Sequence, residues 1–496
     1  MHSRTLFIPL VVLGTFVGVV LWTGASSAFA KSTPDPTLGA DAAGDSTVVR
    51  RLVQEALDSN LSLREEEIAL KKTRAALAEA RGQYLPRLDL NARYSRAEGG
   101  RTIDFPVGDL LNPAYRTLND LTGTQQFPQI ENREIGFLRE REQETTLQLR
   151  QPVFNPEILY GSRARGHQVD AQSAAVEAVR RELTRDVRVA YYQYRQAEAR
   201  VDILTAAQAL VQENRRTSER LQAAGKATQE AVYRAEVEVL DVRQQLDDAR
   251  AAVAQARRSL NVLRNRPADA PIPSADVETD VLIERRMRAV RRALGTDVLG
   301  ERMTDPSSGA VSSVVEGRPT LDRLSAAAAA ADDRRQAAPT QYLPTVSLSV
   351  DAGIQGETYG FSGEKPFVLG SVVLEWSLFD GLQRERTIER RRLEARQLRT
   401  RRADVAQQLG LEVRTAIEDV RVARQALQTA TARVRAARES FRLAERRYEA
   451  GRASFVEYTD ARTARTEAEL NATMTRYDLL IRLARLAYAA GVGAAE

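Results

Sequence analysis

Long stretches of this chain place apolar residues at helical spacing with no proline between them. Two such stretches run from about residue 157 to 221 and from 383 to 447. Part of the first follows a seven-residue repeat, which predicts a helix packed side by side with a partner helix. The members of this repeat are Val176, Leu183, Ala190, Ala197, Leu204 and Val211. At 1.5 Å per residue each stretch would span roughly 100 Å, far more than a compact domain.

Each long stretch is followed by a short break that contains a glycine, and then by a second helical stretch. The breaks lie at Gly225 and Gly451, and the returning stretches cover residues 228–263 and 455–488. Glycine permits the positive φ that a tight helix-to-helix turn needs. The pattern predicts two antiparallel helical hairpins, at residues 157–264 and 383–488.

Four shorter segments alternate apolar and polar residues at the spacing of a strand. They are residues 84–95, 145–154, 342–353 and 367–379. Each is long enough to cross a bilayer as a tilted strand, although soluble hairpins with one wet face are the alternative. Strands in lipid must form a closed barrel, and four strands are too few to enclose a lumen. A membrane barrel would therefore take eight strands from two copies or twelve from three.

The chain is internally duplicated. Tyr84-Leu85-Pro86 and Tyr342-Leu343-Pro344 introduce corresponding strand segments, and an aromatic residue, Phe154 or Phe379, ends the second strand segment of each copy. Such self-similarity is sought before any other feature of the fold. The predicted organisation is a first repeat at 49–264, a linker at 265–317 with a short helix at 281–294, a second repeat at 318–490 and a tail at 491–496. The loop 96–144 contains three prolines and several glycines, which predicts irregular structure.

The first thirty residues have the pattern of a secretory signal peptide. Arg4 precedes an apolar stretch at residues 6–22, and Ala28-Phe29-Ala30 offers the small residues of a cleavage site. An uncleaved N-terminal membrane anchor is the alternative. We expect residues 1–30 to be removed, residues 31–48 to be flexible, and the mature protein to be exported.

Composition argues against an enzyme. The chain has no cysteine, and His167 is the one histidine outside the expected signal peptide. Thiolate chemistry is thereby excluded, and no phosphate-binding loop or nucleophile elbow occurs, so we expect no catalytic site, metal or cofactor. The net charge of +5 invites a nucleic-acid partner. However, acidic residues interleave with the arginines at helical spacing, which is typical of a solvated, self-paired helix face.

Together these features resemble the TolC-like outer membrane efflux proteins. The most specific local match is residues 447–455, Arg-Tyr-Glu-Ala-Gly-Arg-Ala-Ser-Phe, which resembles the family's periplasmic-tip turn. Residues 221–228 are similar and hold the matching place in the first repeat, and Arg318-Pro319-Thr320-Leu321 resembles a pattern at the start of the second. The resemblance implies a mainly helical protein with membrane strands, in which three protomers share one β-barrel and one helical tunnel.

The resemblance also implies partners. Family members form homotrimers in outer membrane lipid and meet a periplasmic adaptor, which links them to an inner membrane transporter. The chain would then be the passive exit duct of a tripartite efflux or type I secretion system. The positions that match the docking tips are Ala224, Gly225, Lys226, Ala227, Thr228, Ala450, Gly451, Arg452, Ala453 and Ser454.

The resemblance further implies a periplasmic constriction. Glu457 and Asp460 have the i, i+3 spacing that places both carboxylates on one helix face, and they follow the second tip turn at the family's distances. Tyr448 matches a family tyrosine before the turn. In a trimer these acids would form a ring of six carboxylates that favours cations. Two exposed acids paired with nearby arginines are the alternative.

The competing function is that of a periplasmic coiled-coil adaptor subunit. Such a subunit is also exported and rich in antiparallel coiled coil, but it should contain one hairpin between two halves of a β-domain. Two hairpins, each preceded by strands, favour the exit duct.

Overall fold

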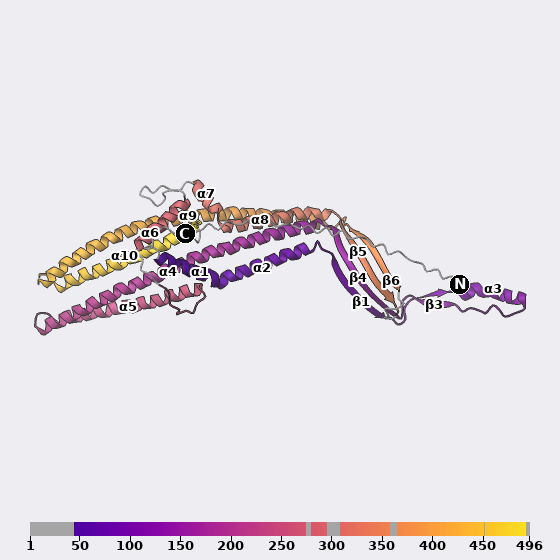
Figure 1. Ribbon diagram of the computed structural model, residues 1–496, viewed down its shortest axis with the longest axis horizontal. Helices are drawn as coiled ribbons and strands as arrows, with labels where there is room; N and C mark the ends of the chain where they lie inside the picture. Colours follow the sequence, from indigo (N-terminus) through magenta and orange to yellow (C-terminus); the bar gives the residue numbers. More distant parts are fainter. Residues whose placement is uncertain (1–43, 274–278, 295–307, 358–364, 451, 493–496) are drawn as a thin grey trace, which may run out of the picture. The chain divides into compact units, whose positions relative to one another are not determined.

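The computed structural model describes residues 44–273, 279–294, 308–357, 365–450 and 452–492. The expected signal peptide at 1–30, Gly451 and residues 493–496 lie outside these ranges, as do residues 31–43. Figure 1 labels the helices and strands in chain order.

Two very long helices organise the chain. Helix α4 (Pro156–Ala223) has 68 residues and α9 (Gln383–Glu449) has 67, or about 100 Å each at 1.5 Å per residue. The start of α4 is defined by Asn155, whose side chain accepts a hydrogen bond from the Glu157 backbone N–H at 3.1 Å, and by a proline in the first turn. Along α4, the predicted seam residues Val176, Leu183, Ala190, Leu204 and Val211 are buried.

Each long helix returns through a 35-residue partner, α5 (Gln229–Leu263) or α10 (Phe455–Ala489). Helix α5 packs along α4, and α10 packs along both α9 and α4. Within the described residues, no helix holds an apolar stretch suited to crossing a membrane.

In both repeats a short helix continues the line of the returning helix beside the long one. Helix α2 (Leu61–Gly82) begins where α5 ends, because the Asn60 amide donates to the Leu263 carbonyl oxygen at 2.9 Å. Helix α8 (Pro319–Ala337) begins where α10 ends, because the Arg318 guanidinium donates to the Tyr488 and Ala489 carbonyl oxygens at 2.7 and 3.0 Å. These bonds satisfy helix-terminal carbonyls that have no partner within their own helix.

The main core lies midway along the long helices, where three shorter helices join them. These are α1 (Gly44–Ser59), α6 (Thr279–Leu294) and α7 (Ser308–Glu316). Because α1 begins at Gly44, residues 44–48 are helical, although we expected the whole segment 31–48 to be flexible. The linker holds α7 in addition to the expected helix. Val311 and Val315 of α7 are buried in this core. This tertiary packing stabilises a helix that the serine-rich sequence does not predict.

The strands β1 (Arg87–Arg96), β4 (Arg141–Phe154), β5 (Thr345–Gly356) and β6 (Lys365–Glu375) form one antiparallel sheet in the order β1-β4-β5-β6. The register aligns apolar residues with one another, and polar residues with one another, across β1, β4 and β5, whereas β6 is mixed, with Leu369 opposite Asp351. One apolar row is Leu90, Leu147, Ala352 and Val368, and the next in register is Leu88, Leu149, Val350 and Gly370. The opposite face carries polar residues such as Asp89, Gln148 and Asp351.

Strand β6 ends at Glu375, four residues before the expected end at Phe379. The residues that follow bind other partners. The Trp376 indole N–H donates at 3.0 Å to the carbonyl oxygen of Tyr342, the last residue of the 3₁₀ helix η2 (Ala338–Tyr342). The carbonyl oxygens of Ser377 and Leu378 accept hydrogen bonds from the buried Arg384 guanidinium at 2.8 and 3.2 Å.

The expectation of irregular structure across residues 96–144 is wrong. Besides the ends of β1 and β4, this segment contains β2 (Thr102–Phe105), α3 (Val107–Thr122) and β3 (Arg133–Gly136). Strand β2 pairs with β3, and α3 tolerates Pro113 within its length. We call residues 97–140 the arm. Its helix is held to its own chain by asparagine side chains. Its leucines recur at helical spacing and are a signal of this helix, although the three prolines of the segment favoured irregular structure.

Candidate gate at the hairpin tips

The first tip turn, residues 224–228, joins α4 to α5. Gly225 has φ of 69°, the left-handed conformation that glycine adopts without strain. The Lys226 backbone N–H donates to the Leu221 carbonyl oxygen at 2.8 Å, and that of Gly225 donates to Gln222 at 2.9 Å. This bonding ends α4 in a Schellman motif. The Thr228 hydroxyl then caps α5 by accepting from the Ala231 backbone N–H at 3.3 Å.

The second tip turn, residues 450–454, joins α9 to α10 in the same manner. The Arg452 backbone N–H donates to the Arg447 carbonyl oxygen at 2.7 Å, the counterpart of the Lys226 bond in the first tip turn. Ala450 is the C-cap of α9, and Ser454 is the N-cap of α10. In both tip turns the described residues are exposed except for Ala227 and Ala453, which are half-buried.

Glu457 caps its own helix. Its carboxylate accepts a hydrogen bond from the Ser454 backbone N–H at 3.0 Å, while the Ser454 hydroxyl accepts from the Glu457 backbone N–H at 3.2 Å. This reciprocal arrangement is a capping box, and the Ser-x-x-Glu spacing in the sequence is its signal. Glu457 and Asp460 both remain exposed at the start of α10.

Tyr448 belongs to an aromatic cluster that braces the second tip turn. Its ring stacks on Tyr458 with centroids 4.9 Å apart, and it lies 6.4 Å from the Phe455 ring. Phe441, which is 4% exposed, lies 5.7 Å from Tyr458. Burial raises the pKa of both the Tyr448 and Tyr458 hydroxyls. The aromatic cluster joins α9 to α10, and no spacing in the sequence marks its members as partners of Tyr448.

A buried ion pair connects the two hairpins behind the tip turns. The Arg462 guanidinium on α10 pairs with the Glu238 carboxylate on α5, and their side chains are 4% and 17% exposed. Burial lowers the pKa of Arg462 to about 10. Arg462 also lies over the Tyr458 ring at 5.9 Å, so the ion pair adjoins the aromatic cluster.

Asp460 lies beside this ion pair, in a groove between α5 and α10. The groove is lined by Arg234, Val237, Glu238, Asp241, Phe455, Val456, Thr459 and Asp460. Arg234 is the first-repeat counterpart of Asp460, and it forms an ion pair with Glu230 at 2.6 Å. The structure thus brings Asp460 into the contact between hairpins, while the Glu457 carboxylate turns back to cap its own helix.

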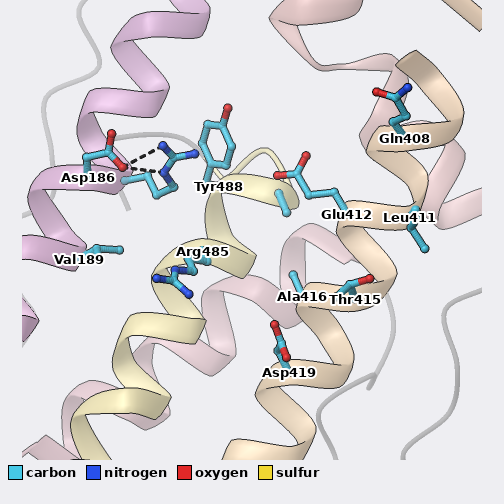
Figure 2. A pocket seen from close by; sticks show the side chains of 12 residues that line it. Asp186, Val189, Gln408, Leu411, Glu412, Thr415, Ala416, Asp419, Arg485 and Tyr488 are labelled. Atoms are coloured by element: carbon cyan, nitrogen blue, oxygen red, sulfur yellow. Dashed lines mark hydrogen bonds and ion pairs between the residues drawn. The ribbon is translucent and has the colours of Figure 1, made fainter. Parts of the chain in front are cut away.

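A second concave site lies where α10 ends between α4 and α9. This pocket of about 620 Å³ is shown in Figure 2, with Tyr488 between Asp186 and Glu412 in the view drawn. The guanidinium carbons of Arg185 and Arg318 lie 4.6 and 4.3 Å from the centre of the Tyr488 ring. Since Arg318 also bonds the end of α10, its role in the described structure is to join α8 to α10.

Comparison with known proteins places these features in context. The sequence model of the family described as outer membrane efflux protein matches residues 52–266 and 310–492, which include both hairpins. The comparison with curated proteins found no match.

Solved structures share the fold at low sequence identity. The channel-forming protein CusC is 16% identical, with a TM-score of 0.73 over 93% of this chain and 96% of that one. The open state of the MtrE outer membrane channel of Neisseria gonorrhoeae is 19% identical, with a TM-score of 0.70 over 89% and 88%. The CmeC outer membrane channel of Campylobacter jejuni is 15% identical, with a TM-score of 0.69 over 90% and 85%.

Proposed function

Since this chain belongs to the outer membrane efflux protein family, we propose that three copies assemble into one duct, gated at the hairpin tips. The protein is an exit channel of the outer membrane with a large periplasmic helical part. Its family is one of efflux channels and not of enzymes. The trimer, its partners and its gate are the proposals argued below.

The four-stranded sheet is the observation that supports assembly of several copies into one barrel. Its outer strands β1 and β6 each have one edge without a strand partner among the described residues. One face presents apolar rows to solvent, with Leu90 70% and Val368 76% exposed. A sheet with an apolar face needs lipid against that face, and its edges need closure in lipid. Three copies supply twelve strands, which suffice for a barrel that encloses a lumen.

The tip turns are proposed as the docking surface for a periplasmic adaptor. Their described residues are mostly exposed, and the Lys226 and Arg452 backbone N–H groups make corresponding bonds, so a trimer would present six similar turns at one end. Their small residues leave the backbone accessible to a partner helix. An adaptor bound there would connect the duct to an inner membrane transporter, which supplies the energy, while this chain conducts substrates passively.

The proposed constriction lies just behind the second tip turn. Tyr448 is held by the aromatic cluster, Glu457 caps α10, and Asp460 borders the groove between the hairpins. Three copies of Glu457 and Asp460 would gather negative charge in a narrow passage and favour cations. Movement of α9 and α10 away from α5 would open this passage, and the pair of Arg462 with Glu238 opposes that movement.

The alternative function as an adaptor subunit is less well supported. The family model covers both hairpins and both strand pairs, whereas an adaptor requires a single hairpin. We find no feature of the described residues that favours the adaptor over the duct.

Native mass spectrometry in detergent, combined with site-specific cross-linking in cells, tests the proposal. We expect three copies per particle, and a photo-reactive residue at Lys226 should cross-link an exported coiled-coil protein. The same residue at Gln244, exposed midway along α5, is the matched control. A monomer would refute the trimer. Trimers with equal cross-linking at both positions would refute docking at the tip turns alone.

A further inference from the structure

The arm carries a helix whose apolar side faces outward. Helix α3 places Leu110, Ala114, Leu118 and Leu121 along one side, and Leu110 and Leu121 are 74% and 78% exposed. Strands β2 and β3 of the arm also expose apolar side chains, among them Ile103 and Ile135. Large exposed apolar surfaces mark sites of association.

The polar side of α3 is the side packed against its own chain. Asn112 bonds the Ile130 backbone twice, its amide N–H donating to the carbonyl oxygen at 2.8 Å and its amide oxygen accepting from the N–H at 2.8 Å. Asn119 bonds the Phe127 backbone in the same reciprocal way, at 2.8 and 3.0 Å. These two residues lie one heptad apart and so share a face. Their bonds fix which side of α3 faces out.

Hydrogen bonds also fix the start of α3. The Asn132 side-chain oxygen accepts from the backbone N–H groups of Gly108 and Asp109 at 2.9 and 3.1 Å. A Cβ atom at Gly108 would lie 2.3 Å from the Ile130 carbonyl oxygen, so only glycine fits this approach. The outward leucines therefore belong to a well-defined module.

The arm continues the strand pair at one edge of the sheet. The β1–β4 ladder ends with Arg96 opposite Arg141, and the Ala97 backbone N–H then donates to the Glu140 carbonyl oxygen at 3.1 Å. Strand β1 is an edge strand, so in a closed barrel it lies at the seam between protomers. Its ten residues cover about 33 Å, and a tilt near 45° brings this close to the roughly 25 Å of the apolar band. The arm thus starts where the membrane ends.

We infer that the leucine face of α3 packs against the arm of a neighbouring copy, so that the three arms form a collar outside the barrel. This inference rests on the proposed trimer. A second copy is the occupant that the position favours, because the arm extends from the seam strand and threefold symmetry places an identical apolar surface at each of the three seams, around one rim. Lipid cannot be the occupant if the arm lies beyond the apolar band.

Single cysteines test this contact directly, because the chain contains no cysteine. In separate variants, Leu110→Cys and Leu121→Cys place a thiol on the leucine face. Asp120→Cys is the control, on an exposed residue of the same helix about 100° around its axis from Leu121. Each purified variant is treated with a short bis-maleimide, and native mass spectrometry of the same sample before treatment counts the copies.

The expected result is at least fivefold more cross-linked dimer for Leu110→Cys and Leu121→Cys than for Asp120→Cys. Three copies per particle without this excess would overturn the inference and leave the trimeric duct intact. Equal yields at all three positions would indicate random collision and overturn it as well. A monomer before treatment would refute the trimer and the inference together.

Discussion

Arg462 on α10 and Glu238 on α5 form a buried ion pair between the two hairpins. The two residues come from different repeats. The positions that correspond to them in the other repeat do not hold an arginine and a glutamate that could form the same pair. The ion pair lies beside Tyr458 and so couples the contact between hairpins to the aromatic cluster under the second tip turn. In the proposed gate, closure would therefore depend on a contact that joins non-equivalent positions of the two repeats.

Glu238→Ala should weaken this contact and open the tip. Removal of one partner from a buried pair leaves the other charge uncompensated, at a cost of about 3 kcal/mol in the free energy of unfolding. We expect a lower unfolding temperature and a larger single-channel conductance. Glu213→Ala is the control, because Glu213 forms exposed ion pairs with Arg216 and Arg220 and should cost less than about 1 kcal/mol. Equal, small effects of both changes would contradict this role of the pair.

Arg384→Ala should destabilise the junction between the sheet and α9. The buried guanidinium donates to the carbonyl oxygens of Gln341, Ser377 and Leu378 and pairs with Asp380 at 2.9 Å. Its loss leaves several acceptors unsatisfied, and we expect a cost of about 3 kcal/mol, measured by thermal unfolding in detergent. The neighbouring Arg386→Ala, at an 81% exposed side chain, should change little. An unaltered unfolding temperature in Arg384→Ala would refute the assignment.

Alkaline pH should loosen the second tip turn through Tyr448. Burial raises the pKa of this hydroxyl above its value in the unfolded chain, near 10. The neutral phenol therefore contributes stability that is complete below about pH 10 and is lost as pH rises through the folded-state pKa. The unfolding free energy of wild type relative to Tyr448→Phe should be constant near neutral pH and fall above about pH 10. The exposed Tyr233→Phe is the control, and a pH-independent difference for Tyr448→Phe would contradict the prediction.

The duplicated sequence predicted the hairpins and strand pairs because their patterns are local and repeat. The correspondence extends to single contacts. Gln151 donates to the Tyr84 carbonyl oxygen at 2.9 Å, and Trp376 donates to that of Tyr342 at 3.0 Å. The two donors are 225 residues apart (376 − 151), as are Phe154 and Phe379 (379 − 154). The donor is a glutamine in the first repeat and a tryptophan in the second, yet both donate to a tyrosine carbonyl oxygen.

The other features of the site depend on contacts between residues far apart in the sequence. No local pattern in a single sequence indicates such contacts. Glu238 and Arg462 each lie among other charged helical residues, and no spacing marks them as partners. Helix α3 packs through asparagines and exposes its leucines, so the spacing of the leucines indicates a helix but does not indicate which face is buried. The capping box of Glu457, by contrast, is predictable from the sequence, because Ser454 precedes Glu457 by three residues.

The cap and the charge of Glu457 can be separated by substitution. Glu457→Gln keeps a side chain that can accept from the Ser454 backbone, whereas Glu457→Ala removes it. We expect Glu457→Ala to lower the unfolding free energy by about 1 kcal/mol and Glu457→Gln to change it far less. Differential scanning calorimetry of the two variants measures this. Equal losses would show that the charge, rather than the cap, stabilises α10.

Single-channel recording in planar bilayers tests the central claim most directly, with wild type compared with Glu457→Gln/Asp460→Asn. These changes remove the proposed ring of carboxylates and leave the capping box largely intact. The account predicts small, cation-selective steps for wild type, and reduced selectivity with altered conductance for the variant. Unchanged selectivity would remove the acidic constriction while keeping the duct. Folded trimers that never conduct, in wild type or in Glu238→Ala, would contradict the gated exit duct itself.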